Sequence, residues 1–443
     1  MLLFTNVRHV ATMNDAGDRL SGVDVLVDGP RITRIERSIE APVDARVIDC
    51  SSMLMIPGLV NLHHHFYQTL QRNVPAAQNA KLFDWLTTLY GVWAGLTADA
   101  VRASTRLASA ELLLTGCTMA SDQMYVFPTG VSEDLIGIEI EAARELGIRF
   151  HPTRGSMSRG RSDGGLPPDS VVQDADTILK DSERLIETFH DSEPFALVRV
   201  ALAPCSPFSV TGELMAETAD ETAYCLETYG VRPLALMERF GWIGGDVWFA
   251  HGVHFEDAEL DLLAATGTAV AHCPTSNMRL GSGVARVPEM LDRGVRVGLA
   301  VDGSASNDTS DMLGELRNCL LVHLLTEGPT SLTAEAVLRM ATRGGADILG
   351  RDEIGSIEEG KAADLVLIDL NRLGYAGALS DPQAAIVYAG FDHRVDYTVV
   401  NGEIVVERGR LVNADEAEIA RTANGLAVRM LEAAGAESGR RPS

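Results

Sequence analysis

The stretch that decides the fold runs over residues 56–68 and reads IPGLVNLHHHFYQ, an apolar segment that ends in three histidines. Because successive side chains of a strand point to opposite faces, His63 and His65 share one face while His64 points to the other. Paired imidazoles at a strand end suit a divalent cation such as zinc or iron. The alternative is a surface histidine cluster, which the apolar run and its leading Pro-Gly disfavour, because they indicate a buried strand. Further ligands are expected downstream.

The bulk composition limits the partners. A chain of 443 residues suits one large α/β domain with a smaller companion. Its net charge of −25 argues against a nucleic acid or an anionic membrane, because a polyanion is repelled. The six cysteines show no C-x-x-C spacing, which favours a reducing compartment. With neither a signal-peptide pattern nor 18 uninterrupted apolar residues, we expect a cytoplasmic protein without a membrane segment.

Short β-type runs separated by turns occupy both ends of the chain. Residues 2–55 predict a small antiparallel sheet, and a matching set at 364–407 includes the hairpin signal Asn401-Gly402. The two sets most simply form one composite β-sandwich with the large domain inserted between them. The predicted division is 1–55 and 356–411 for the sandwich, 56–355 for the barrel, and 412–443 for a C-terminal helix and tail.

Between the β segments, short apolar strands alternate with helical stretches, which is typical of a parallel α/β barrel. We predict the α/β class, with a (β/α)8 TIM-type barrel and the small composite sandwich. A closed barrel of this type needs eight strands. Seven candidates are visible, at residues 56–62, 117–122, 148–153, 198–203, 247–250, 269–272 and 297–301.

Active sites in such barrels lie where the strands end. Asp302 follows the strand at 297–301 and would complete the pair of imidazoles, although an aspartate there is often only a helix N-cap. His251 follows the strand at 247–250 and could orient a metal-bound water or a substrate oxygen, but a lone histidine there is more often structural. His272 also ends a strand, and a structural and a supporting role both stay open.

His-x-His on the first strand, His251 after a later one and Asp302 after the last together resemble the amidohydrolase superfamily, in its metal-dependent aminohydrolase branch. The resemblance covers nearly the whole chain, because barrel and composite sandwich are that superfamily's architecture. Residues 63–70, 82–86, 155–158 and 162–174 look like bacterial 8-oxoguanine deaminases, which are often grouped with hydroxyatrazine-type aminohydrolases.

The resemblance implies a hydrolytic deaminase with one divalent metal ion, zinc or else iron. Its ligands would be His63, His65 and Asp302, and Asp302 would also act in catalysis. His251 would hydrogen-bond the nucleophile or the developing oxyanion. Gln68 is the candidate for a substrate hydrogen bond, with a polar surface residue as the alternative. Binuclear relatives have a lysine at the end of the fourth strand, which this sequence lacks.

The implied substrate is a small heterocycle, first 8-oxoguanine, which would give urate and ammonia. A hydroxyatrazine or other triazine aminohydrolase and a pterin (isoxanthopterin) deaminase are the alternatives. The zinc deaminase pattern H-x-E with P-C-x-x-C is absent from the sequence, so the cytidine deaminase fold is not expected. A homodimer is the family's expectation.

The sequence departs from the family pattern after Met215. The family carries a further histidine ligand on the fifth strand, in H-x-H-L-A-E-T, whose glutamate is the proton shuttle. Here 216–218 resembles the tail of that motif, but the strand and both histidines before it are absent. Because losing a strand breaks a closed barrel's ring of hydrogen bonds, we expect that the sequence skips a segment. Glu217 is then the shuttle. If the deletion is real, Glu217 is an ordinary helix residue, and an inactive amidohydrolase-fold scaffold becomes the alternative.

Overall fold

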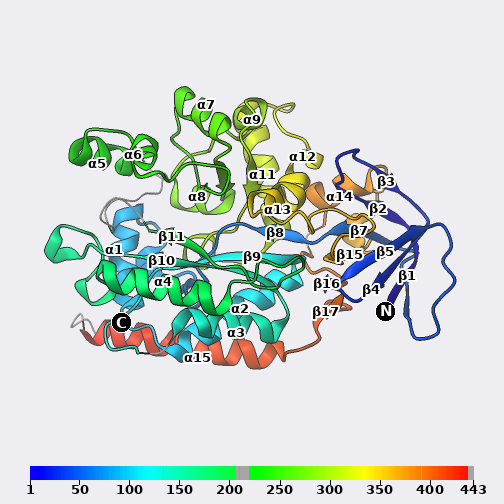
Figure 1. Ribbon diagram of the computed structural model, residues 1–443, viewed down its shortest axis with the longest axis horizontal. Coiled ribbons are helices and arrows are strands. Elements are labelled where there is room, and N and C mark those ends of the chain that lie inside the picture. The colour runs from blue at the N-terminus through cyan, green and yellow to red at the C-terminus, as the bar shows by residue number, and fades with distance from the viewer. Residues whose placement is uncertain (133, 206–208, 210–218, 391, 438–443) are drawn as a thin grey trace.

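A sandwich of two sheets lies at one end of the molecule beside the N-terminus, and a parallel barrel with its helices makes up the rest (Figure 1). The structure is a computed structural model in which residues 1–132, 134–205, 209, 219–390 and 392–437 are described. The last helix runs along the outside of the barrel, so the two ends of the described chain lie far apart.

The sandwich is built from both ends of the chain, as predicted. One sheet has the order β5-β4-β1-β6 and the other β18-β17-β16-β15-β7-β2-β3. Apolar side chains from both, including Phe4 and Leu367, form the core between them. The first sheet contains β1 (Leu2–Val7), β4 (Val23–Asp28), β5 (Arg31–Glu36) and β6 (Arg46–Asp49). The second contains β2 (His9–Ala11), β3 (Arg19–Leu20), β7 (Met53–Pro57), β15 (Leu365–Asp369), β16 (Tyr397–Val400), β17 (Glu403–Glu407) and β18 (Arg410–Leu411).

The pairing within the sandwich corrects one expectation and confirms another. The N-terminal strands are not purely antiparallel, because β6 crosses back to lie parallel to β1, and β2 lies parallel to β7. The hairpin at Asn401-Gly402 is confirmed, since β16 and β17 pair antiparallel around it. Both turn residues have positive φ, 52° and 82°, the backbone that Asn-Gly tolerates best.

The apolar stretch at 56–62, predicted as one strand, is divided between the two parts of the fold. β7 pairs with β15 in the sandwich, whereas β8 (Leu59–Asn61) pairs with β9 in the barrel. Gly58 joins them: its N–H donates to the Asp364 carbonyl at 2.9 Å, and a Cβ there would lie 2.0 Å from the Thr118 hydroxyl. Only glycine allows this close approach, so the strand that leads to His63 is anchored on both sides.

The barrel strands form two parallel arcs. The first contains β8, β9 (Cys117–Met124), β10 (Arg149–Ser156) and β11 (Ala201–Pro204). The second contains β12 (Trp248–Ala250), β13 (Ala269–His272) and β14 (Val297–Leu299). The arcs meet where Leu62 donates its N–H to the Leu299 carbonyl at 3.2 Å. Within the described ranges the barrel therefore has the seven strands that the sequence predicts.

The other ends of the two arcs do not pair with each other in the described part of the chain. A cavity lies between them, lined by Leu202 and Ala203 of one arc, by Trp248 and Phe249 of the other, and by His63 from the interior. This opening is the place where an eighth strand would close a (β/α)8 barrel.

Helices cover the outside of both arcs (Figure 1). Several begin at a side-chain cap: Asp134, Asp174 and Asp311 each accept the N–H three residues on. Among the described residues, no helix is both long and apolar enough to cross a membrane. The α-helices are α1 (Leu82–Trp93), α2 (Ala98–Leu114), α3 (Leu135–Leu146), α4 (Ala175–Phe189), α5 (Ala219–Tyr229), α6 (Pro233–Phe240), α7 (Asp257–Thr266), α8 (Pro274–Leu280), α9 (Val287–Asp292), α10 (Ser304–Asn307), α11 (Met312–Glu327), α12 (Ala334–Arg339), α13 (Gly345–Ile348), α14 (Pro382–Tyr388) and α15 (Glu416–Glu437). Short 3-10 turns are η1 (Phe66–Gln71), η2 (Pro75–Ala77), η3 (Arg161–Asp163), η4 (Asp169–Val171) and η6 (Leu373–Tyr375), and η5 (Met340–Gly344) is a π-helical turn.

Candidate metal and catalytic site

The structure brings His63, His65 and Asp302 together inside the barrel. The Nε2 atoms of His63 and His65 lie 3.4 and 3.5 Å from Oδ1 of Asp302, and all three residues are buried. One nitrogen or oxygen from each lies within 4.8 Å of the others. Nε2 of His63 is buried and makes no hydrogen bond to any described residue. An unsatisfied nitrogen in such a place is costly unless something binds it, so the donor set fits a zinc-class ion.

Hydrogen bonds orient the rings on both faces of this histidine run. Nδ1 of His65 lies 2.9 Å from the Gln123 carbonyl, which can only accept, so the lone pair of Nε2 faces Asp302. His64 points to the opposite side, as predicted, where its Nε2 meets the Ser310 hydroxyl at 3.0 Å. Burial, reinforced by His63, lowers the pKa of His65 to about 3, which keeps it neutral.

Asp302 is held by three donors. The hydroxyls of Ser276 and Ser306 lie 2.6 and 2.9 Å from Oδ2, and the Gly303 N–H lies 2.6 Å from Oδ1. Burial alone would raise the pKa of the carboxyl, but the contact with His63 and the electrostatic effect of the imidazoles of His251 and His63 hold that pKa well below its usual range. The backbone of Asp302 has φ 65°, a strained value that aims this carboxylate at the histidines.

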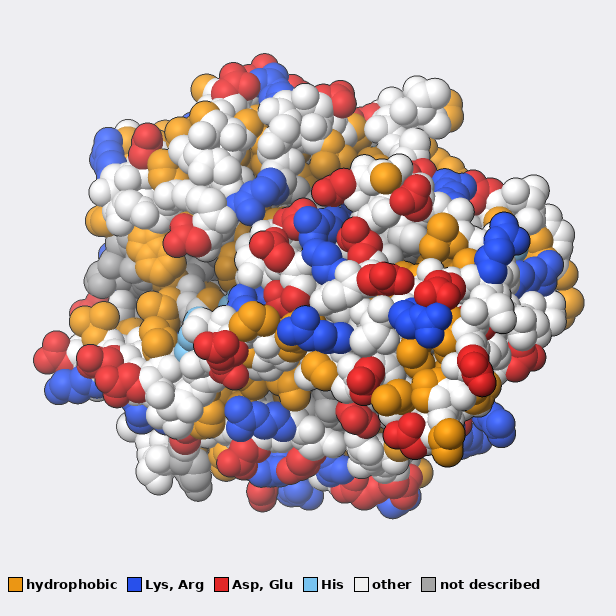
Figure 2. All heavy atoms as spheres, turned by 45° about the vertical axis from the view of Figure 1, so that its right-hand side comes forward, with side chains coloured by type: hydrophobic (Ala, Val, Ile, Leu, Met, Phe, Trp, Pro, Cys, Tyr) orange, Lys and Arg blue, Asp and Glu red, His pale blue; other side chains and the backbone are white. Residues whose placement is uncertain are grey.

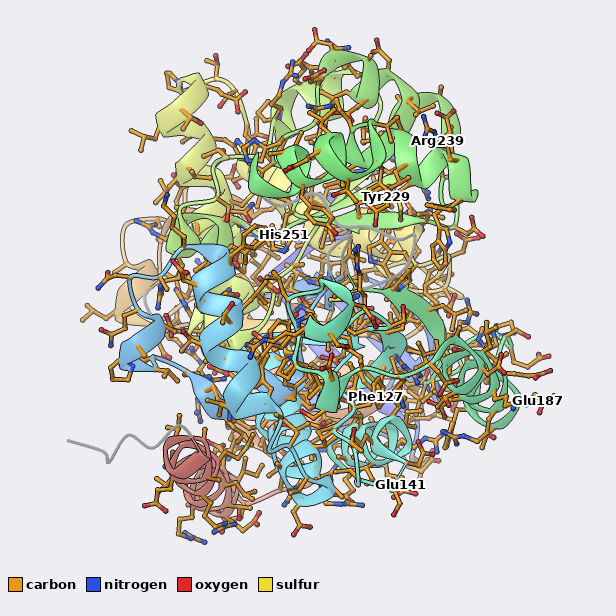
Figure 3. The ribbon with its side chains drawn as sticks, turned by 90° about the vertical axis from the view of Figure 1, so that its left-hand side faces the viewer. Phe127, Glu141, Glu187, Tyr229, Arg239 and His251 are labelled. Carbon is orange, nitrogen blue, oxygen red and sulfur yellow. The ribbon has the colours of Figure 1, made fainter. Side chains whose placement is uncertain are left out.

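His251 lies beside the cluster, at the end of β12 and near the middle of the molecule (Figure 3). Its Nε2 is 3.8 Å from Oδ2 of Asp302. Its Nδ1 is 2.8 Å from the side-chain oxygen of Asn277, so the lone pair of Nε2 faces the carboxylate. Like Asp302, it has a positive φ, 66°. His251 can therefore contact whatever the three-residue cluster binds.

Gln68 is buried, so its alternative interpretation as a polar surface residue is wrong. It lies in η1, where the chain turns directly after the histidine run. A Cβ on Gly303 would lie 2.0 Å from the Gln68 amide oxygen, which places this oxygen against the residue that follows Asp302. The same oxygen has no hydrogen-bond partner among the residues described, so an acceptor is available next to the cluster.

Glu217 lies outside the described residues, which leave out 206–208 and 210–218. The expected proton shuttle and the place of the absent histidine motif therefore stay predictions.

No pattern in the sequence points directly to several side chains that support the cluster. Ser276 and Asn277 lie in the first turn of α8, and Ser306 lies in α10, so each comes from a short helix after a barrel strand. Small polar residues at helix starts usually act as caps, which hides such a role. The only available hint is the segment 272–277, HCPTSN, which follows a barrel strand as the other site residues do.

Aromatic side chains pack behind the histidines. Tyr125, just after β9, stands edge-on to His65 with ring centroids 5.1 Å apart. Tyr67 lies between Tyr125 and Trp93, at 5.7 and 5.4 Å. Burial raises the pKa of Tyr67 well above its usual value, so its hydroxyl stays protonated. This packing fixes the imidazole ring of His65 in place.

A parallel barrel with paired histidines after its first strand, a histidine after a later strand and an aspartate after its last defines the class of amidohydrolase-type enzymes. The chain belongs to the amidohydrolase family, whose profile matches residues 54–405.

Relatives and solved structures agree with this class. The chain is 44% identical to an 8-oxoguanine deaminase of Pseudomonas aeruginosa, over 89% of this chain and 92% of that protein. It is 38% identical to a hydroxydechloroatrazine ethylaminohydrolase of a Pseudomonas species, over 97% of this chain and 95% of that protein. The zinc complex of atrazine chlorohydrolase from Arthrobacter aurescens superposes with a TM-score of 0.92 at 34% identity, covering 96% of this chain and 100% of that one.

One of these alignments also measures a difference in length. The alignment with the ethylaminohydrolase spans 459 residues, whereas 97% of these 443 residues is only about 430. That relative therefore has about 30 positions with no counterpart here. A helix and a strand would need roughly this many residues.

Proposed function

We propose that this protein is a metal-dependent hydrolytic deaminase of an amino-substituted heterocycle, and that its first candidate substrate is 8-oxoguanine, which water converts to urate and ammonia. The observation that carries the proposal is the buried cluster of His63, His65 and Asp302 with His251 beside it. The 44% identity to an 8-oxoguanine deaminase supports the choice of substrate.

Each described residue would have a distinct role. His63, His65 and Asp302 would hold one divalent ion, zinc first because a similar solved structure is a zinc complex. When bound, that ion would activate water for attack on the amine-bearing carbon. Asp302, ionised and beside the attacking oxygen, would accept a proton. His251 would hydrogen-bond the same oxygen through Nε2. The Gln68 oxygen would accept an N–H of the heterocycle.

We propose further that the complete enzyme carries a segment after Met215 that supplies a barrel strand and another histidine ligand. Glu217 would then move the proton from the nucleophile to the ring nitrogen and the leaving amine. The opening between β11 and β12 and the extra length of a relative support this.

The intact mass of the purified protein tests that step. A mass that exceeds 47.5 kDa by the mass of one strand and one helix would support the longer chain. A mass equal to 47.5 kDa would contradict it and favour the inactive scaffold.

Ammonia release from 8-oxoguanine, measured with added zinc, tests the activity itself. We expect His63→Asn to reduce kcat/KM by more than about 100-fold, because it removes a proposed ligand. His9→Asn, a histidine of the sandwich, is the matched control and should not change it. A chelator should abolish activity and zinc should restore it. No ammonia from 8-oxoguanine would contradict the proposed substrate.

Two other substrates have support from particular relatives. The ethylaminohydrolase is similar over 97% of this chain, and an isoxanthopterin deaminase is 33% identical over 87%. Parallel assays with hydroxyatrazine, isoxanthopterin and guanine would rank them against 8-oxoguanine. A protein that binds no zinc or iron after growth in metal-rich medium, and releases no ammonia from any of the four, would support the scaffold.

We propose a cytoplasmic location and a homodimer. All six cysteines are buried, and Cys50, Cys117, Cys273 and Cys319 form no disulfide, as a reducing compartment allows. Light scattering on the eluted protein would test the dimer, and a mass of one chain would contradict it.

A further inference from the structure

A second group of metal-binding side chains lies on the outer side of β13, away from the proposed active site. His272, Cys319 and His323 are all buried, and one nitrogen or sulfur from each lies within 4.8 Å of the others. We propose that these three side chains bind a zinc-class transition-metal ion that joins the barrel wall to helix α11.

The alternation of β13 explains why His272 faces outward. Ala271 packs into the barrel interior with Val60 and Leu62, whereas Val270 packs with the helix layer. His272 is two residues from Val270 and therefore points the same way, toward the helices.

Helix α11 supplies the other two groups. Cys319 and His323 are four residues apart, so they lie on one face of the helix, one turn from each other. Nε2 of His323 reaches to 3.2 Å from Nε2 of His272. Two elements that are distant in sequence thus present three soft or borderline ligands to one point.

Glu327 prepares His323 to act as a ligand. Its carboxylate lies 3.1 Å from Nδ1 of His323 and can only accept, so Nδ1 carries the hydrogen. The lone pair of His323 Nε2 then faces His272 and Cys319. Carboxylate–histidine–metal arrangements of this kind fix the tautomer and raise the basicity of the ligand.

The spacing matches what zinc requires. Zinc–nitrogen distances of about 2.0–2.1 Å place two tetrahedral ligands about 3.3 Å apart, close to the 3.2 Å between the two Nε2 atoms. Without an ion, these nitrogens share one hydrogen, and Nδ1 of His272 has no partner among the described residues. Binding would break the S–H bond of Cys319, form a sulfur–metal bond and release one proton to solvent.

Cobalt(II) titration of the chelator-treated full chain tests the proposal. A thiolate bound to cobalt gives an intense charge-transfer absorption in the near ultraviolet. Nitrogen and oxygen ligands give no such absorption. The proposed active-site cluster contains no sulfur, so its loading leaves this band unaffected. Because the proposed active site also takes up cobalt, we expect the band to saturate by about two added equivalents in the wild type, at the intensity of one thiolate-bound ion per chain, and to be absent in Cys319→Ser. Cys50→Ser, a buried cysteine of the sandwich, is the matched control and should keep it.

Two results would overturn the proposal: no charge-transfer band in the wild-type protein, or an unchanged band in Cys319→Ser. Should Cys319→Ser fail to fold, His323→Asn provides the second test. It keeps the thiol but removes one imidazole, so the cobalt Kd should rise more than about 100-fold. An unchanged Kd in that variant would also overturn the site.

Discussion

The spacing of the three histidines at 63–65 decides which of their side chains can bind the same ion. Strand alternation separates His64 from its two neighbours, and each ring then finds a different partner. His65 is oriented by a backbone carbonyl, whereas His251 is oriented by the side chain of Asn277. His65 and His251 both present a nitrogen lone pair to the same carboxylate, that of Asp302. The orienting partners therefore matter as much as the groups that would bind the metal.

Ser276 provides the first prediction at this scale. Of the two hydroxyls that donate to Asp302, that of Ser276 makes the shorter hydrogen bond. We expect Ser276→Ala to weaken zinc binding at the proposed active site by about 10–100-fold, because the carboxylate loses its orientation. Competition with a zinc chelator would measure this. Ser104→Ala, which removes a buried hydroxyl from α2, should leave the zinc affinity unchanged, and equal effects of both variants would contradict the prediction.

At the scale of elements, a buried ion pair ties the barrel to the sandwich. Arg149 of β10 makes two hydrogen bonds to Asp364, at 2.9 and 3.0 Å, and both side chains are inaccessible to solvent. The same carboxylate accepts the N–H of Asn401 from the hairpin turn. One arginine thus connects a barrel strand with two segments of the sandwich.

We expect Arg149→Met to lower the free energy of unfolding by about 3–5 kcal/mol, because Asp364 would be left charged, buried and unpaired. The double variant with Asp364→Asn should lose less than the sum of the two single variants. Urea denaturation measures these differences. Arg34→Met, which breaks an exposed pair with Glu36, is the control and should change stability by less than about 1 kcal/mol. Equal losses from Arg149→Met and Arg34→Met would contradict the prediction.

His393 contacts the N-cap residue of α11, and this contact predicts that the stability of the fold depends on pH. A hydrogen bond with Asp311, the N-cap of this helix, raises the pKa of His393 above 6.5. A raised pKa stabilises the folded protein fully below the unfolded value of 6.5, and that contribution disappears as the pH rises through the folded value. Because His393 is partly exposed, its contribution is below about 1 kcal/mol.

The comparison of wild type with His393→Asn isolates this effect. The difference in free energy of unfolding should be largest near about pH 6 and should shrink toward about pH 9. Denaturation at several pH values measures it. A difference that stays constant, or grows with pH, would show that the ion pair has no such role.

At the scale of the whole molecule, the dominant feature is a barrel whose described strands pair on one side and not on the other. The described strands close on one side through β14 and β8 and leave β11 and β12 without a further partner. On the face that Figure 2 shows, which includes the sandwich side, acidic and basic side chains are intermingled, and the chain has a net charge of −25. That overall charge repels polyanions and agrees with a small-molecule partner.

Hydrogen exchange should reveal this opening. For the 443-residue chain, we expect amides of β11 and β12 to be protected about tenfold less than those of β9 and β13, because each of these two strands has one edge that pairs with no other described strand. Tenfold corresponds to about 1.4 kcal/mol of opening free energy. Mass spectrometry of peptides from these strands measures it. Equal protection would mean that both edges are covered.

Much of the fold could be predicted because it depends on local patterns. β13 begins and ends where the residue pattern predicts, at residues 269–272, and the Asn-Gly hairpin is confirmed. The division of 56–62 at Gly58 could not be predicted, because the apolar run is continuous and only the strand's partner changes. Hydroxyls such as that of Ser276 were missed because their role depends on where Asp302 lies.

The sequence by itself determined which side chains stand at strand ends, since alternation along a strand is a property of consecutive residues. It thereby selected His63, His65, His251 and Asp302. Only the tertiary structure decided that these residues meet, that Gln68 is buried beside them, and that a second group forms between β13 and α11. Distances between residues far apart in sequence follow from how strands pair and helices pack, which no local pattern contains.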